Sequence, residues 1–176
     1  RSDGIENATV KTLVSSLLSD AEGYKKYRVA EFEPYESVST LRSRLKISAE
    51  YCAYENPSGI YFNANETIYI IAEGIPESES VSLIVKNWGK ATDDEAQSQT
   101  NFILHNGLNT ITPTHRGNGY VSYYSNNYAT LPNVKLHFVN ATVTGYFDLD
   151  RGDTNTDWKK LLSSAKSDIL DVRTKR

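Results

Sequence analysis

Apolar residues follow two different periods along this chain, and the period changes near residue 57. In residues 5–18 they recur every three or four positions, which places them on one side of a helix. Residues 35–46 and 156–166 show the same helical pattern. From residue 58 to residue 150 apolar positions instead alternate with polar ones, as in strands that bury one face. The chain is therefore predicted to be mainly β, with flanking α-helices.

The change of period coincides with the turn sequence Asn56-Pro57-Ser58-Gly59. A residue that precedes proline is pushed out of the helical region, and glycine accepts a positive φ at little cost. The helical pattern is therefore expected to end here, and Gly59 to lead into a first strand at Ile60.

The alternating region divides into seven or eight short runs separated by turns. Because no helical pattern lies between them, a parallel sheet is disfavoured and an antiparallel β-sandwich or jelly roll is predicted. Asn106-Gly107 stands between two runs, which predicts a two-residue hairpin turn. His137 falls on the polar positions of its run, so its side chain is expected to face solvent or to bond locally. The runs are 60–62, 67–72, 81–88, 102–105, 108–111, 120–125, 134–139 and 141–147.

These patterns divide the chain into three parts. Residues 1–47 form a helical lead-in, residues 48–150 the β-sandwich, and residues 151–176 a linker helix that leads toward a downstream domain outside this sequence. The acidic stretch Asp148–Asp157 precedes that helix. It fails the calcium-loop pattern of an EF-hand at three positions, whereas carboxylates before a helix N-terminus commonly cap it. Capping is the favoured interpretation, with a calcium site left as the alternative.

Composition excludes several classes of function. The chain has 19 basic and 22 acidic residues and a net charge of −3, without a basic stripe, so nucleic acid is not an expected partner. No apolar run is long enough to span a membrane. Cys52 is the single cysteine, so no disulfide can form within the chain. His105, His115 and His137 have no histidine one helical turn away, so no metal site or catalytic residue is predicted.

Aromatic residues with a polar tip supply the candidate binding site. The chain has 12 tyrosines and 2 tryptophans but 5 phenylalanines, a composition that suits exported β-proteins and sugar-binding faces. Asn87 and Trp88 end one strand before a long polar segment, and Tyr124, Asn126 and Asn127 end another. An aromatic face with amides and carboxylates around it is typical of carbohydrate sites. The alternative is that Trp88 closes the end of the sandwich core.

The turn near residue 57 also carries a family resemblance. Tyr54–Phe62 resembles the Asn-Pro-(Ser/Thr)-Gly-Ile-Tyr-Phe signature of enhancin-like zinc metallopeptidases. These are enzymes of gut bacteria that degrade mucins and other glycoproteins. Further motifs of that family follow in the same order, and the resemblance covers roughly residues 48–172. They lie at residues 83–88, 108–113, 119–124, 134–139, 143–149, 156–159 and 171–172.

The resemblance implies a non-catalytic N-terminal β-sandwich that precedes the catalytic domain. The family's His-Glu-x-x-His zinc motif does not occur in these 176 residues, so zinc is expected in the catalytic domain and no cofactor in this chain. The implied protein is exported, either secreted or on the cell surface. Its accessory domain would bind or position glycosylated substrate, such as mucin-type glycans, or buttress the catalytic domain. A structural spacer without ligand and a free-standing carbohydrate-binding module remain as alternatives.

Overall fold

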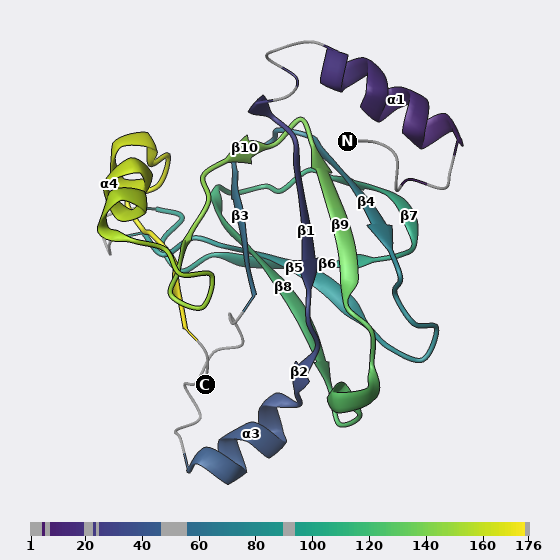
Figure 1. Cartoon of the computed structure of the whole chain (residues 1–176), viewed down its shortest axis with the longest axis vertical. Coiled ribbons are helices and arrows are strands. Elements are labelled where there is room, and N and C mark those ends of the chain that lie inside the picture. The colour runs from purple at the N-terminus through teal and green to yellow at the C-terminus, as the bar shows by residue number, and fades with distance from the viewer. Residues whose placement is uncertain are drawn as a thin grey trace.

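A computed structural model of the protein describes residues 5, 8–19, 23, 25–46, 56–89 and 94–174, without the side chains of Thr9 and Leu13. Two antiparallel sheets pack face to face (Figure 1), which confirms the predicted β-sandwich. The first sheet has the order β1 (Arg28–Phe32), β9 (Val134–Val139), β4 (Ile68–Glu73), β7 (Gly107–Ile111). The second has the order β10 (Thr142–Val143), β3 (Pro57–Phe62), β8 (Gly117–Ser125), β5 (Val81–Lys86), β6 (Gln99–Leu104).

Two short parallel pairs supplement these sheets. β2 (Tyr35–Glu36) lies beside the end of β8. β11 (Phe147–Asp148) pairs with β12 (Val172–Arg173) in a separate two-stranded sheet. Each pair is two residues long, so the main sheets remain antiparallel as predicted.

The core between the sheets is built from the alternating positions. Val134, Leu136 and Phe138 of β9 are fully buried and face Leu83 and Phe62 of the opposite sheet within one apolar cluster. Burying a side chain of this size stabilises the fold by roughly 1.5–3 kcal/mol. The alternation read from the sequence is therefore the physical basis of the sandwich.

The described helices lie outside the sandwich, at α1 (Ala8–Ser19), α3 (Val38–Leu45), α4 (Asn155–Ser164) and the short η1 (Tyr128–Thr130). α1 buries Val10 and Val14 against Ile71 and Val139 on the outer face of the first sheet. A helix of this length is marginal in water by itself, so this packing holds it. The three predicted helices are confirmed, except that α3 begins at Val38 because Tyr35–Glu36 belongs to β2.

The helical lead-in predicted for residues 1–47 contains strand structure as well as its two helices. β1 pairs with β9 from Arg28 opposite Phe138 to Phe32 opposite Val134, and Phe32 is buried in the core. Five residues between two helical patterns are too short a run for alternation to stand out. The sandwich therefore begins inside the lead-in.

The prediction of a hairpin at Asn106-Gly107 is wrong, because β6 and β7 lie in different sheets. The Asn106 side chain donates to the carbonyl of Ile75 at 2.8 Å and accepts from the amide of Ile75 at 2.9 Å. These bonds tie the turn to the segment after β4. The dipeptide carries the chain from one sheet to the other, and local turn chemistry does not report which partner the next strand takes.

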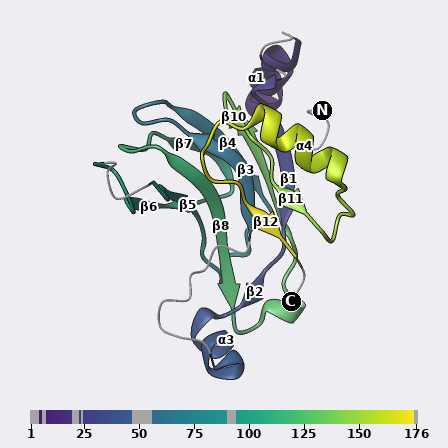
Figure 2. The same cartoon turned by 90° about the vertical axis from the view of Figure 1, so that its left-hand side faces the viewer.

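The last predicted run, 141–147, is interrupted. Gly145 has φ +73°, and strand structure is confined to β10 and β11 on either side of it. After α4 the chain turns back, and β12 pairs with β11. Residues 151–176 are therefore more than a linker helix, because their far end joins the domain (Figure 2).

Replacing Asn106 with aspartate separates the two interpretations of this turn. The aspartate would keep the acceptor for the Ile75 amide but lose the donor to its carbonyl, so we expect the unfolding free energy to fall by about 1–2 kcal/mol. A two-residue hairpin would tolerate Asp-Gly. Urea unfolding measures the change, and Asn101→Asp on the exposed strand β6 is the matched control. Equal stability of the two variants would contradict the bridging role.

Candidate functional site

The five predicted sugar-binding residues fall into two groups at opposite ends of β8. β5 runs antiparallel to β8 with Lys86 opposite Asn118, so Asn87 and Trp88 lie beside the start of β8. Tyr124, Asn126 and Asn127 lie at or just beyond its other end. The structure does not bring the two groups together into one site.

Trp88 is half-buried and anchored at its polar tip. Its Nε1–H donates to the hydroxyl of Tyr120 at 2.8 Å, and the two rings meet edge to face with centroids 6.5 Å apart. The ammonium of Lys86 lies 5.1 Å from the centre of the indole ring, within cation–π range. Asn87 is buried, and its side-chain oxygen accepts from the amide of Gly89 at 2.7 Å. These contacts favour the alternative interpretation, in which Trp88 closes the end of the sandwich core.

The hydrogen bonds continue from Trp88 to the C-terminal segment. The Tyr120 hydroxyl donates to Oδ1 of Asp171 at 2.6 Å, and the Asn118 amide donates to Oδ2 of Asp171 at 3.2 Å. The same Asn118 amide donates to the carbonyl of Ile169 at 3.2 Å. Trp88, Tyr120, Asn118 and Asp171 are hereafter the Asp171 network. It fastens the chain after α4 to β8.

Burial controls the protonation of this network. It raises the pKa of Tyr120, with a further contribution from the charge of Asp171, so the phenol keeps its proton and donates. Burial also raises the pKa of Asp171, against the lowering effect of its bonds to Tyr120 and Asn118. The sequence offers no signal for this arrangement, because Asp171 is about fifty residues from its partners.

Arg173 forms a second anchor on the same segment. Its guanidinium pairs with Glu33, donates to the hydroxyl of Tyr35 at 2.9 Å, and lies 3.9 Å from the carboxylate of Asp148. Burial raises the pKa of Tyr35 to about 12. Together with the Asp171 network, Arg173 fastens residues 169–173 to the sandwich.

The hollow beside Trp88 is small. It has a volume of about 60 Å³ and is lined in part by Asn87, Trp88, Asn118 and Ile169. Ligand pockets commonly have volumes of about 300–1,000 Å³, so this hollow is small for a sugar-binding pocket.

The other group of candidates is more open. Asn126 and Asn127 are exposed, and Asn126 accepts a 3.4 Å hydrogen bond from the hydroxyl of Thr40. The Tyr124 ring is half-buried and packs against Tyr35, with centroids 6.1 Å apart. Its hydroxyl is buried without a partner among the described residues. Tyr124 therefore offers little free ring surface for stacking.

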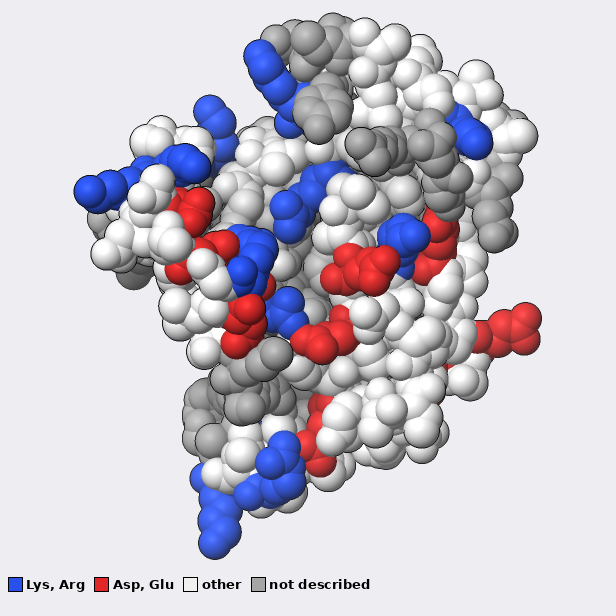
Figure 3. Space-filling model, in the orientation of Figure 1, with Lys and Arg blue, Asp and Glu red and all other residues white. Residues whose placement is uncertain are grey.

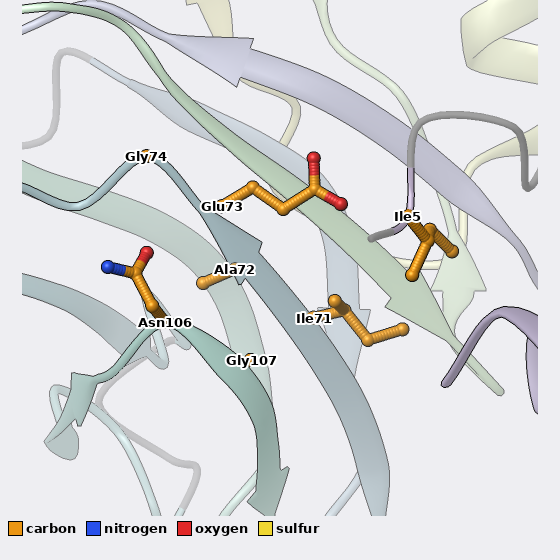
Figure 4. A pocket seen from close by; sticks show the side chains of 7 residues that line it. All are labelled: Ile5, Ile71, Ala72, Glu73, Gly74, Asn106 and Gly107. Atoms are coloured by element: carbon orange, nitrogen blue, oxygen red, sulfur yellow. The ribbon is translucent and has the colours of Figure 1, made fainter. Parts of the chain in front are cut away.

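Two further hollows contain none of the five candidates. One, of about 470 Å³, lies between β4, the start of β7 and Ile5 (Figure 4); Ile71 and Ala72 line it with Glu73 and Asn106. The other, of about 320 Å³, lies between α4 and the segment around Tyr146 and Arg151. Neither presents an arrangement of nucleophile and base among its described lining residues.

The acidic stretch before α4 is engaged in local hydrogen bonds. Asp157 accepts from the amide and the hydroxyl of Thr154 and completes a capping box with it, which confirms the capping interpretation. Oδ1 of Asp148 accepts from the amides of Asp150 and Arg151, and Asp153 pairs with Arg151. These carboxylates are already used in shaping the loop.

The histidines do not fit a zinc site. His105 is exposed, His115 bonds Thr100 and the carbonyl of Arg116, and His137 bonds Tyr27. Among the described residues, no three His, Cys, Asp or Glu side chains are grouped as metal ligands. Cys52 lies outside the described residues. No step of a metal-dependent reaction can be assigned to the described side chains.

Of the two expectations for His137, the solvent-facing side chain is contradicted, whereas the hydrogen-bonded one agrees with the structure. Its side chain is 3% exposed, because the outer face of β9 and β4 is covered by α1 and by Tyr27. The Tyr27 hydroxyl forms a 2.6 Å hydrogen bond with Nδ1 of His137, and Nε2 lies 3.6 Å from the carboxylate of Glu73. The alternation in β9 indicates one buried face, but α1, which is distant in sequence, covers the other face as well.

Charge does not single out a site on the face of the molecule that Figure 3 shows. Across the middle of the face in Figure 3, acidic and basic side chains are interspersed rather than separated by sign. In the part of the chain that the structure describes, no helix has both the length and the apolar character to cross a membrane.

Comparison with known proteins identifies the family. Residues 36–137, more than half of the chain, match the family model for the N-terminal domain of M60-like peptidases. The comparison with curated proteins gave no match.

Solved structures show the same fold. They include a metallopeptidase in complex with Tn antigen (24% identity, TM-score 0.70) and a metallopeptidase from Bacteroides thetaiotaomicron (23%, 0.74). A third is the ZmpB metallopeptidase from Clostridium perfringens (17%, 0.64). The matches cover 88%, 94% and 83% of this chain but 29%, 29% and 32% of those chains. The chain thus spans less than a third of each structure.

Truncating Trp88 tests its structural role. Trp88→Ala should lower the unfolding free energy by about 3 kcal/mol, because it removes both packing and the bond to Tyr120. Trp88→Phe should cost less, about 1 kcal/mol, since a smaller aromatic ring still packs there and mainly the bond to Tyr120 is lost. Tyr128→Ala, at an exposed aromatic, is the control and should stay within about 0.5 kcal/mol. A stable Trp88→Ala that loses retention on mucin would instead support an exposed sugar platform.

The buried His137 predicts a loss of stability in mild acid. Burial, with the charge of Lys135, lowers the pKa of His137 from 6.5 to about 4, so the unfolded chain binds this proton more readily. Stability should be complete above about pH 6.5 and decline toward pH 4, by up to about 1.4 kcal/mol per pH unit. Urea unfolding across this range should show a shallower decline in His137→Gln. The exposed His105→Gln should keep the wild-type slope; equal slopes in both variants would refute the assignment.

Proposed function

Because the chain belongs to the family of N-terminal domains of M60-like peptidases, we propose that it is a non-catalytic accessory domain that buttresses the catalytic domain of its peptidase. The observation that supports this role best is the anchored C-terminal segment. Asp171 is held by Tyr120 and Asn118, and Arg173 by Tyr35 and Glu33. A chain fastened at these two points leaves the sandwich in a fixed direction, so a domain that follows it would be held in a defined orientation.

The proposed parent is an exported peptidase, secreted or on the cell surface, that acts on mucin-type glycoproteins. Support comes from the solved structures of similar fold, one of which is in complex with Tn antigen and another, a catalytic domain, with sialyl T antigen. The catalytic zinc would be held outside this domain, since its histidines lie apart. The partner of this domain is then the catalytic domain of the same polypeptide.

Direct glycan binding is the second candidate, supported by the exposed Asn126 and Asn127 beside Tyr124. It has weaker support than buttressing, because Asn87 is buried and the indole Nε1 of Trp88 already donates to Tyr120. A spacer without ligand would need no fixed orientation and would gain nothing from the two anchors.

Loosening the connection tests the buttress. A six-residue Gly/Ser insertion directly after Arg176 of the full-length protein should lower kcat/KM for mucin and reduce the melting temperature of the catalytic domain by several degrees. The same insertion in the exposed β4–β5 turn, after Glu77, is the control and should leave both unchanged. If the first insertion has no effect, the domain is a spacer. Retention of the isolated chain on mucin, lost in Asn126→Ala, would favour glycan binding.

A further inference from the structure

The β11–β12 sheet has its charged side chains inside and its apolar side chains outside. Phe147 is opposite Val172 and Asp148 opposite Arg173, and paired residues share one face of a sheet. Asp148 is 6% exposed and lies near Arg173, on the face toward the sandwich. Phe147 and Val172 therefore occupy the other face. Leu149 lies in the turn directly after β11, and its amide donates to the carbonyl of Arg173 at 3.0 Å, which keeps it beside this face.

Helix α4 extends this apolar face. The Trp158 ring packs edge to face on Phe147, with centroids 5.5 Å apart. Leu162 follows Trp158 by one helical turn and so lies on the same side of the helix. Figure 2 shows α4, β11 and β12 together on one side of the molecule. The C-terminal apolar face comprises Phe147, Leu149, Trp158, Leu162 and Val172.

The outer members of this face are open to solvent. Leu149 is 53% exposed, Leu162 50% and Val172 56%. Single exposed apolar residues are normal, whereas a contiguous patch marks an interaction surface. Here the reversal of polarity adds to the argument. A sheet that had only to face water would place Asp148 and Arg173 outward and its apolar residues inward.

We infer that the C-terminal apolar face is the surface on which the catalytic domain of the same polypeptide packs. This inference rests on the proposed function. Val172 belongs both to the face and to the segment by which the chain leaves the sandwich, one residue from the anchored Asp171. In a family of N-terminal domains the rest of the peptidase follows on the C-terminal side. The following domain therefore begins beside this face, held there by the Asp171 network.

Replacing an exposed leucine tests the assignment, and the chain offers a matched control. Leu162 and Leu108 are 50% and 49% exposed, and Leu108 lies on the edge strand β7, away from the face. In the full-length protein, Leu162→Ser should lower the melting temperature of the catalytic domain by about 2–4 °C, and Leu108→Ser should leave it unchanged. In the isolated chain the two substitutions should shift melting equally little. Hydrogen exchange at β11 and β12 should rise in full-length Leu162→Ser.

The outcomes separate this inference from the proposed function. If the insertion after Arg176 uncouples the domains but full-length Leu162→Ser behaves like Leu108→Ser, the buttress stands and another surface carries the contact. If neither change affects the catalytic domain, the proposed function fails as well. If the isolated chain forms a dimer that Leu162→Ser abolishes, the face binds a second copy and the inference is overturned.

Discussion

The hydroxyl group of Tyr120 connects the β-sandwich to the C-terminal segment that follows α4. It accepts from Trp88 and donates to Asp171, so one buried phenol joins the end of a core strand to the segment after α4. The ring belongs to β8, in the middle of the second sheet, and burial keeps its proton in place. Without that donor the half-buried Asp171 carboxyl would keep, among the described residues, the side-chain amide of Asn118 as its donor. These hydrogen bonds therefore hold the segment around Asp171 rigidly against the sandwich.

The sandwich itself could be predicted from the sequence, because Val134, Leu136 and Phe138 alternate at the period that a sheet requires. Three features could not, and each depends on contacts between residues distant in sequence. Asn106-Gly107 predicts a turn, but it does not indicate to which sheet the next strand belongs. His137 looks solvent-facing until α1 covers its strand. Asp171 gains its role from Tyr120, and no local pattern marks such a pair.

The candidate site shows the same division. Trp88 stands out in the sequence for its chemistry, yet the contacts of its indole nitrogen and ring serve the interior of the domain. What sequence reasoning missed was the surface formed by Leu149, Leu162 and Val172, since each belongs to a different part of the fold. Its signal is the pairing register of β11 and β12, which exists only in the folded chain. Recognition of the family, in contrast, needed only motifs in order along the chain.

The position of β1 has a practical consequence for anyone who isolates this domain. The family match begins at residue 36, after β1 has ended, yet β1 forms the border of the first sheet beside β9. A protein trimmed at that boundary would leave one edge of the apolar strand Val134–Val139 without hydrogen-bond partners. Uncovered edges of this kind pair with other chains. Such a fragment would be prone to precipitate even though most of its core residues were present, and a start before Arg28 avoids this.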